Sequence, residues 1–389
     1  MRFTVIFPLI ALYVFLRGVY PLFRGKMRWL SFLVFIPVAL TPTIARYVGG
    51  PMVAPDLSPF WIVVGDYVQL VVLFCAVIVG VRDVATILTR PFGLRLNRWT
   101  GSRVLMSAAF VFAMVLTAAS EWQGLLLPGV QVQRIAVPHL PEALEGLRIA
   151  HLSDIHVSGL FRADRTQAIV DRTNATKPDL VVITGDYVDG SPEGRGSDVK
   201  PLADLRAPMG VWGCEGNHEH YVDYDGWMRF FAEHGIRLLR NEHTVLTDRG
   251  YPLVIAGVTD PVARKYARTE PNPQQALKDA PKGFVILLAH QPKSAPEYAR
   301  YGVDLMLSGH THGGQMPGLD VVVKATNGGF VEGVYRVNPH PESTSSATTQ
   351  DNRSKMTLYV HPGTQVWNGF PLRLGTSNQI TLLELVRAE

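Results

Sequence analysis

The stretch PDLVVITGDYVDG, residues 178–190, decides the fold class that we predict for this chain. A short apolar run ends there at Gly185–Asp186, which is typical of a buried strand. An earlier stretch, LRIAHLSDIHVSG (residues 147–159), has the same form, and the segment between the two has helical spacing. Together they predict a β-α-β unit, whose parallel strands place their acidic ends at the same edge of one sheet.

Three later segments repeat this pattern of an apolar run that ends in polar residues. They are GVWGCEGNHEHY (210–221), GFVILLAHQP (283–292) and VDLMLSGHTHGGQ (303–315). Taken alone, Asn217 could be a turn former and His290 a surface residue at a strand end. The repetition over five segments instead favours one site at the carboxyl edge of an α/β sheet. The candidate side chains are Asp154, His156, Asp186, Asp189, Asn217, His218, Glu219, His290, His310 and His312.

The donor atoms in this set point to metal chemistry. Oxygen and imidazole donors without sulfur suit Mn²⁺, iron or Zn²⁺ rather than a structural thiolate zinc site. Seven of them are too many for one open catalytic ion, but they fit two ions that share a carboxylate and hold the oxygens of a phosphoryl group. His310 and His312 are close enough in sequence to face two neighbouring ions. These seven are Asp154, His156, Asp186, Asn217, His290, His310 and His312.

Composition divides the chain into two parts, which we place at residues 1–123 and 124–389. The first part contains four apolar stretches, each near the roughly 17–25 residues that cross a bilayer as a helix. Buried core helices are the alternative, but four such runs in succession are hard to bury in water. Asp66 and Gln69 are expected to be interfacial or to face the helix bundle. The stretches are Phe3–Phe23, Trp29–Ala45, Phe60–Val81 and Val104–Ala119.

Basic residues predict the orientation of these spans. One group lies between spans one and two and a second between spans three and four, whereas the intervening loop has only Arg46 together with Asp56. The positive-inside rule then places both basic loops in the cytoplasm and residues 124–389 outside it. We therefore expect a multi-pass protein of the cell membrane with an extracytoplasmic domain. The basic residues are Arg24, Lys26, Arg28, Arg82, Arg90, Arg95, Arg98 and Arg103.

The charge and the cysteine content of the chain argue against several classes of protein and of metal site. The formal net charge is +4, and no continuous tract of Lys and Arg indicates nucleic acid as a partner. Cys75 and Cys214 are the only cysteines, so the chain can build neither a disulfide framework nor a thiolate metal site.

The motifs resemble those of the calcineurin-like metallophosphoesterase superfamily. The matches are DxH at Asp154, GDxxD at Gly185, GNHE at Gly216, a lone His290, and GHTH at Gly309, in the family's order. The ending GHTHGGQ and the later YVHPGTQVWNGFPLRLG (359–375) are similar to the membrane-associated bacterial subgroup of YkuE and YaeI type. The chain departs from that subgroup at Asn378–Gln379, where Pro-Glu is usual, and by a polar insert at 338–355.

The resemblance implies a four-layer α/β/β/α sandwich, preceded here by the four-helix transmembrane region, with two divalent ions, of which manganese is favoured. His218 is implied to contact phosphate or protonate the leaving oxygen, and Glu219 and Asp189 to orient it. Arg373 is either a substrate contact or a surface ion pair. One implied ion takes Asp154, His156, Asp186 and His312, and the other Asp186, Asn217, His290 and His310.

The function expected from these observations is a membrane-anchored hydrolase of phosphate esters that acts through a metal-bound hydroxide. Its partners are the lipid bilayer and a phosphate ester that is either soluble or lipid-linked. Two alternatives stay open at this point. One is a phosphoprotein phosphatase or nuclease, which shares the motifs. The other is a membrane protein that transports or senses, and whose phosphoesterase-like domain only binds a ligand.

Overall fold

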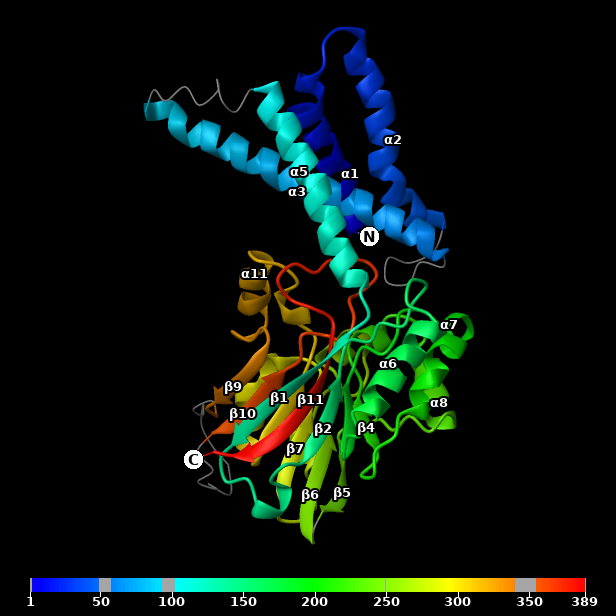
Figure 1. The fold of residues 1–389 in the computed structure, drawn as a ribbon, viewed down its shortest axis with the longest axis vertical. Helices are drawn as coiled ribbons and strands as arrows, with labels where there is room; N and C mark the ends of the chain where they lie inside the picture. Colours follow the sequence, from blue (N-terminus) through cyan, green and yellow to red (C-terminus); the bar gives the residue numbers. More distant parts are fainter. Residues whose placement is uncertain (1, 49–56, 93–101, 249, 340–354, 389) are drawn as a thin grey trace. The chain divides into compact units, whose positions relative to one another are not determined.

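The computed structural model describes residues 2–48, 57–92, 102–248, 250–339 and 355–388 (Figure 1). Asp56, Arg95, Arg98 and residues 340–354 of the polar insert, which entered the predictions, lie outside the described residues. The chain forms two compact units. The helical unit comprises Met1–Gln123 with Asn368–Leu372, and the sheet unit comprises Gly124–Trp367 with Arg373–Glu389.

The described residues of the helical unit form four helices that are long and apolar enough to cross a membrane, as the sequence predicts. The third continues beyond the predicted end at Val81, so Arg82 lies within a helix and its placement in a loop was wrong. The helix tolerates this charge because the Asp83 carboxylate accepts hydrogen bonds from Arg82 (2.7 Å) and from Arg17 (2.8 Å). The helices are α1 (Arg2–Val14, continued by turns to Leu22), α2 (Lys26–Val48), α3 (Pro59–Thr89) and α5 (Arg103–Leu125).

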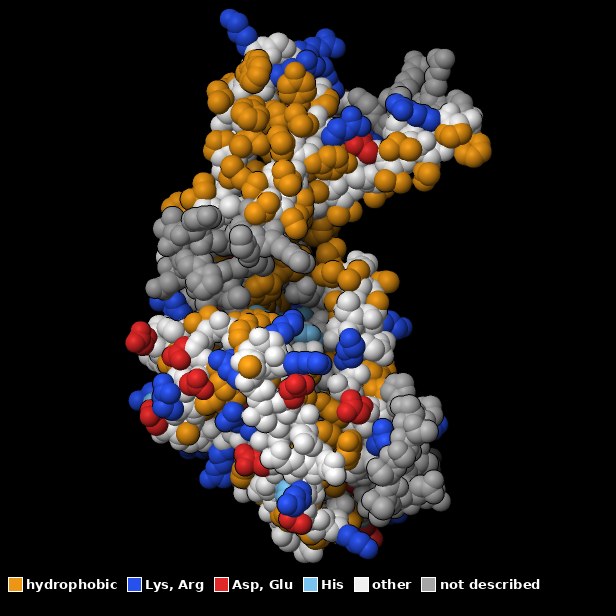
Figure 2. Space-filling view, turned by 180° about the vertical axis from the view of Figure 1, so that it is seen from behind, with side chains coloured by type: hydrophobic (Ala, Val, Ile, Leu, Met, Phe, Trp, Pro, Cys, Tyr) orange, Lys and Arg blue, Asp and Glu red, His pale blue; other side chains and the backbone are white. Residues whose placement is uncertain are grey.

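Side chains in the helical unit are distributed as a bilayer requires. Hydrophobic side chains cover most of the visible surface of this unit (Figure 2). Asp66 and Gln69, which the sequence places at the interface or facing the bundle, are both buried. The Gln69 side-chain amide donates a hydrogen bond to the carbonyl of Gly369 at 3.2 Å, within the segment Asn368–Leu372 that belongs to this unit.

The sheet unit contains two mixed sheets. The first has five strands in the order β1-β11-β2-β3-β4, and the second has six in the order β5-β6-β7-β8-β10-β9. The strands that precede the predicted site, β2, β3, β4, β7 and β8, run parallel within their sheets. The first sheet consists of β1 (Gly129–Val137), β2 (Arg148–Leu152), β3 (Leu180–Thr184), β4 (Val211–Cys214) and β11 (Gln379–Arg387). The second consists of β5 (Glu242–Asp248), β6 (Tyr251–Gly257), β7 (Phe284–Leu288), β8 (Leu305–Ser308), β9 (Gly333–Val337) and β10 (Met356–Val360).

Alternation of apolar side chains along the strands builds the layers. Successive residues of a strand point to opposite faces of a sheet. In β3, Val182 packs between the two sheets, whereas Val181 and Ile183 pack under the helices of the first sheet. In β8, Leu305 packs between the sheets, whereas Met306 faces the outer layer of the second sheet. Both sheets are therefore buried on two sides.

Helices cover the outer faces of the two sheets. The layer on the first sheet is held by Trp227 and Phe231, which are buried with the outward side chains of β2 and β3. The predicted α/β class with its helix–sheet–sheet–helix sandwich is confirmed, together with the four apolar helices that precede it. The helices of the first layer are α6 (Ala163–Ala175), α7 (Pro192–Val199) and α8 (Tyr224–Glu233). The shorter helices after β6 are α9 (Pro273–Ala276), α10 (Ala295–Tyr298) and α11 (Leu319–Thr326).

Candidate metal centre

The loops that follow five parallel strands meet at one edge of the sandwich. All ten candidate side chains named from the sequence come together there, and most are fully buried. The loops after β2, β3 and β4 belong to the first sheet, and those after β7 and β8 to the second. The site therefore forms only when the two sheets pack against each other.

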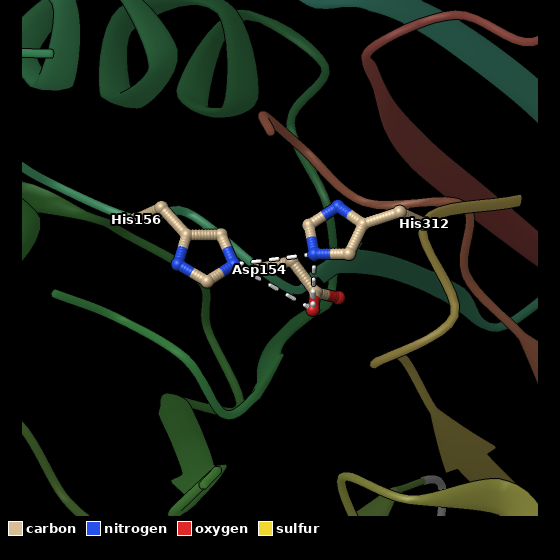
Figure 3. A group of neighbouring side chains, drawn as sticks. All are labelled: Asp154, His156 and His312. Atoms are coloured by element: carbon tan, nitrogen blue, oxygen red, sulfur yellow. Dashed lines mark hydrogen bonds and ion pairs between the residues drawn. The ribbon is translucent and has the colours of Figure 1, made fainter. Parts of the chain in front are cut away.

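Asp154, His156 and His312 form a first group of ligand atoms (Figure 3). Their polar atoms point toward one another, with 3.2 Å between the two Nε2 atoms and 3.4 Å from His312 Nε2 to Asp154 Oδ1. Nitrogen ligands bind Zn²⁺ at roughly 2.0–2.1 Å, so two ligands of one ion lie about 3.0–3.5 Å apart. These three side chains have the spacing of ligands to one cation.

Asp186, His290 and His310 form a second group. His290 Nε2 lies 3.1 Å from Asp186 Oδ2 and 3.2 Å from His310 Nδ1. The Asn217 side-chain oxygen is 3.1 Å from the same His290 nitrogen. The group thus presents carboxylate, amide and imidazole donors to a common point, which is a donor set for a divalent ion such as Mn²⁺ or Zn²⁺.

Asp186 faces both groups. Its Oδ2 lies 3.1 Å from His290 Nε2 in the second group and 3.8 Å from His156 Nε2 in the first. Its Oδ1 accepts the backbone N–H of His218 at 2.9 Å. A carboxylate between two clusters of ligands is the arrangement that two-ion sites use.

The protonation states of most of these groups favour cation binding, which requires neutral imidazole and ionised carboxylate. His290 is the exception, because burial lowers its pKa but Asp186 and other carboxylates outweigh burial and raise it. Burial, followed by the proximity of His290, lowers the pKa of His310 to about 4. Burial also lowers the pKa of His312 to about 3. Burial alone would raise the pKa values of Asp154 and Asp186, but the neighbouring histidines outweigh it and hold both below the usual value. The donor set therefore fits the binding of cations.

His218 and Asp189 form an ion pair beside these groups. His218 Nδ1 lies 2.5 Å from Asp189 Oδ1, and the other oxygen of Asp189 lies 3.2 Å from His156 Nδ1. Burial lowers the pKa of His218, but the charges of Asp186 and Asp189 outweigh burial and raise it to about 9. The raised pKa favours the charged form of His218, and its Nε2 lies 3.9 Å from Asp186 Oδ2.

Backbone strain is frequent at the ligand positions. A positive φ is uncommon for residues other than glycine and costs of order 1–3 kcal/mol, so it persists where the surroundings impose it, often at functional sites. Five of the seven predicted ligands have such backbones. They are Asp154 (φ 53°), His156 (46°), Asp186 (55°), His310 (71°) and His312 (49°).

Two glycines are required because carboxylates occupy the space beside them. A Cβ on Gly216 would lie 2.2 Å from Asp186 Oδ1, and one on Gly309 would lie 2.4 Å from Asp154 Oδ2. No side chain fits at such distances without displacing the carboxylate. The glycines of the GNHE and GHTH motifs thus allow one loop to pack directly on the ligand of another.

Glu219 contacts backbone N–H groups of the ligand-bearing loops and joins two of these loops. Its buried carboxylate accepts the backbone N–H of Asp186 (3.1 Å), Tyr187 (2.7 Å) and Gly216 (2.6 Å). Three backbone donors fix the loop after β3 against the loop after β4. Glu219 thus positions Asp186 and Asn217, whereas the resemblance implied that it orients His218.

Two supporting residues were missed by the sequence reasoning. Glu215 is buried and accepts from Tyr224 (2.7 Å) and Arg240 (3.2 Å), which anchors the start of the GNHE loop. The Gln365 side chain donates to the Ile155 carbonyl at 2.6 Å and so holds the DxH loop. Gln365 lies within the segment 359–375, whose similarity to the bacterial subgroup could have drawn attention to it. No sequence pattern indicated a role for Glu215.

Arg373 is not a surface residue, so the expectation of a surface ion pair was wrong. Its guanidinium is fully buried and donates to the carbonyl of His312 at 2.5 Å, the carbonyl of Gln365 at 3.0 Å and the side chain of Asn378 at 3.1 Å. Asn378 donates in turn to the Gly124 carbonyl at 2.7 Å. Asn378, where the chain departs from the bacterial subgroup, is thus part of a hydrogen-bond network that links the GHTH loop to the start of the sheet unit.

Comparisons with known proteins agree with this geometry. The profile of the family described as "Calcineurin-like phosphoesterase" matches residues 147–314, which include every candidate ligand. A "Transmembrane protein with metallophosphoesterase domain" from Danio rerio is 31% identical over 353 residues, covering 86% of this chain and 76% of that protein. A protein of the same description from Bos taurus is 32% identical, with 83% and 72% covered. The "Uncharacterized metallophosphoesterase YkuE" of Bacillus subtilis is 30% identical over 205 residues, with 51% and 70% covered.

The two transmembrane relatives match more of this chain than the sheet unit contains, so these matches extend into the apolar helices. Identity above 30% over most of both chains, together with a family profile that spans all five ligand-bearing loops, shows a common family. The chain is a membrane protein of the calcineurin-like metallophosphoesterase family, whose members bind divalent metals.

Proposed function

We propose that this protein is a membrane-anchored phosphoesterase that holds two divalent ions and hydrolyses a phosphate ester with water. The observation that carries the proposal is the position of Asp186 between two groups of ligand atoms. Residues 1–123 would serve as the anchor and residues 124–389 as the catalytic domain. One ion would be held by Asp154, His156, Asp186 and His312, and the other by Asp186, Asn217, His290 and His310.

The bound ions would supply positive charge that polarises the phosphoryl group and acidifies a water. The chain's own residues supply the rest. His218 lies at the rim of the second group, with its Nε2 3.9 Å from Asp186 Oδ2, and it would donate its proton to the leaving oxygen. Asp189 holds the imidazole through the Nδ1 contact at 2.5 Å, so that Nε2 carries the proton to be donated. Glu219 keeps the backbone of Asp186 in place.

We propose Mn²⁺ as the first choice, and the donor set is also compatible with iron and Zn²⁺. Three of the seven ligands are oxygen donors and the others are imidazoles, whereas thiolate is absent from the ligand groups. Hard oxygen ligands favour Mn²⁺, and imidazole suits Zn²⁺ and iron.

We further propose that the substrate is a phosphate ester of the cell envelope, including phosphate carried on a lipid. The apolar helices confine the site to the neighbourhood of a bilayer, where such phosphates are abundant. The positive-inside rule applied to Arg24, Lys26, Arg28, Arg90 and Arg103 favours an extracytoplasmic sheet unit. In that location a phospholipid or lipid-carrier headgroup is more accessible than a soluble cytosolic nucleotide.

Turnover by the purified full-length protein tests the proposed chemistry. Metal-stripped protein in detergent would receive Mn²⁺, Fe²⁺ or Zn²⁺ and then a soluble phosphomonoester, a soluble phosphodiester or a long-chain lipid phosphate in mixed micelles. We expect metal-dependent release of phosphate or alcohol, lost in Asp186→Asn. Stoichiometric metal binding without hydrolysis of any of these esters would support the ligand-binding alternative instead.

Protease accessibility tests the proposed side of the membrane. Protease added to intact cells, or to spheroplasts where an outer membrane is present, should digest the sheet unit and spare a reporter placed within residues 93–101. Protection of the sheet unit under these conditions would place it in the cytoplasm and remove the argument for an envelope substrate.

A further inference from the structure

Helix α11 carries an apolar face that none of the described residues covers. Val321 is 66% exposed and Val322 is 57% exposed, side by side in a helix of eight residues. Leu319 and Val323, on another face of the helix, are half-buried. Single exposed hydrophobic residues are ordinary, but adjacent ones on one helix face indicate a surface for contact.

The position of α11 places this face beside the metal centre. The helix follows the GHTHGG loop directly, and Asp320 in its first turn packs against Gly314, where an added Cβ would lie 2.6 Å from the Asp320 Cβ. The Asp320 backbone N–H also donates to the carbonyl of Met316 at 3.2 Å. The exposed valines are thereby fixed at the same edge of the sandwich as His312.

Other exposed apolar residues of the sheet unit lie at this edge. Tyr221 packs against the ring of His218, with 4.9 Å between ring centroids, and Tyr266 lies beside Tyr221. Leu126 and Leu127 precede β1, which starts at this edge because it runs parallel to β11 and β11 runs antiparallel to β2. Exposed apolar groups therefore surround the metal centre from several loops.

The chain itself supplies a reason for a lipid contact here. Its four long apolar helices keep the sheet unit, which is part of the same chain, within reach of a bilayer. The residues at and after the end of the last helix belong to the sheet unit and are held in it by hydrogen bonds. Asn378 donates to the carbonyls of Gly124 (2.7 Å) and Leu126 (2.8 Å), and Arg165 donates to that of Leu125 (2.7 Å).

Charge on and beside α11 also suits a lipid surface. Lys324 is exposed on the helix, and Lys293 is exposed next to the turn that follows it, with its backbone within 3.3 Å of a Cβ built on Gly328. Of the nearby acidic groups, Asp320 accepts from the Gly318 N–H and Glu332 accepts from the Thr376 hydroxyl. Basic residues beside an apolar helix face are the usual composition of an interfacial helix that meets anionic headgroups.

We propose that α11 is a membrane-docking helix of the sheet unit. Val321 and Val322 enter the headgroup–acyl boundary of a bilayer, and Lys324 and Lys293 contact lipid phosphates beside them. Docking through this helix turns the rim of the metal centre toward the headgroup layer. The inference does not depend on the proposed hydrolysis, because a catalytically inactive chain would dock in the same way.

Fluorescence of a single labelled position in the full-length protein tests the docking. Val322→Cys would carry an environment-sensitive fluorophore, in a background where Cys75 and Cys214, both buried, are replaced by alanine. The control is Val245→Cys on β5, a valine of comparable exposure (44%) that is remote in sequence from the metal loops. Both proteins would be placed in nanodiscs of phosphatidylcholine with phosphatidylglycerol, with and without spin-labelled lipid.

We expect blue-shifted emission at position 322, quenched by spin-labelled lipid, and neither effect at position 245. Lys293→Glu combined with Lys324→Glu should weaken the quenching at 322 in anionic nanodiscs. Equal quenching at the two positions, or none at either, would overturn the proposal. A blue shift that grows with protein concentration but is not quenched by lipid would assign the face to a second copy of the chain instead.

Discussion

The helical unit and the sheet unit both bury apolar side chains, but they differ in the side chains that they expose. In the helical unit large apolar residues such as Trp29 and Leu33 are exposed, and Gln69 is buried among the helices. In the sheet unit the strands bury Ile149, Ile286 and similar residues between two sheets. The first arrangement suits a hydrocarbon solvent, in which polar groups must find partners inside the bundle. The second suits water.

This difference changes the meaning of a buried polar residue. In the helical unit, burial of a polar group such as Gln69 follows from the solvent and indicates a contact within the unit. In the sheet unit, the same observation marks a site, because Asp154, Asp186 and His290 could have been placed in water at no cost. These three residues are nevertheless buried, and they lie where the ligand atoms of the site converge.

The largest test of this distinction is the replacement of Asp186 by asparagine. Loss of one carboxylate from between the two ligand groups should remove metal and activity together, because both groups lose a shared ligand. Metal content by mass spectrometry and turnover should both fall to background. Gln69→Ala is the matched control from the helical unit, and it should leave the metal content unchanged. Full activity in Asp186→Asn would refute its assignment as a shared ligand.

The next largest effect distinguishes the loss of a residue that donates a proton from the loss of a residue that binds metal. His218→Ala should retain the ions and lose about 10²–10⁴-fold in kcat, the usual contribution of a positioned acid. His290→Ala serves as the comparison, since it should lose metal as well. If His218→Ala emptied the site, His218 would be a ligand and its role in proton transfer would be wrong.

Arg373 tests whether buried charge in the sheet unit also has a structural use. Arg373→Ala leaves the carbonyls of His312 and Gln365 without their donor, which should lower the free energy of unfolding by about 3 kcal/mol. Thermal unfolding of the full-length protein in detergent measures this loss. Arg373→Lys keeps the charge and should recover only part of it, because an ammonium cannot reach the same three acceptors. Wild-type stability in the alanine variant would contradict the proposed network.

A smaller effect should appear when pH is lowered. Burial lowers the pKa of His290, but Asp186 and the other carboxylates outweigh it and raise that pKa well above the usual value. A proton on His290 must therefore leave before a cation binds, and each pH unit below that pKa should weaken metal affinity about tenfold. Calorimetric titration with Mn²⁺ at several pH values measures the slope. Affinity independent of pH would indicate that His290 is not a ligand.

The smallest expected effect is the change in stability when an exposed residue of the helical unit is replaced. Leu33→Ala should change stability by only a few tenths of a kcal/mol, since Leu33 is exposed and contributes little to packing within the unit. Ile286→Ala, in the core between the two sheets, should cost about 2–5 kcal/mol by the same assay. Equal losses would show that Leu33 packs against a partner protein or another copy.

Much of the fold and of the candidate site could be predicted from the sequence because both depend on local patterns. Apolar runs of different length separate membrane helices from strands, as at α3 and β3, since the length of a run reflects the thickness of a bilayer or of a sheet. The positions of Asp186 and His310 could be predicted because parallel strands deliver their last residues to one edge.

Residues whose roles depend on long-range contacts could not be predicted in this way. Arg373 carries no local signal of burial, and its partners His312 and Asn378 lie on either side of it in different segments. Glu215 precedes the GNHE motif like any acidic residue at a strand end, yet it is buried by Tyr224 and Arg240. Only the packing of the two sheets and of the last segment of the chain determines such partners.

The sequence by itself thus determined which residues can bind a cation and in which order the loops present them, because the identity and spacing of donors are local properties. Tertiary structure decided how Asp154, Asp186 and His312 face one another, since they come from two sheets that meet only in the folded chain. It also decided that Val321 and Val322 remain exposed beside the site, because the exposure of a side chain depends on what packs around it, and neighbours in space are not neighbours in sequence.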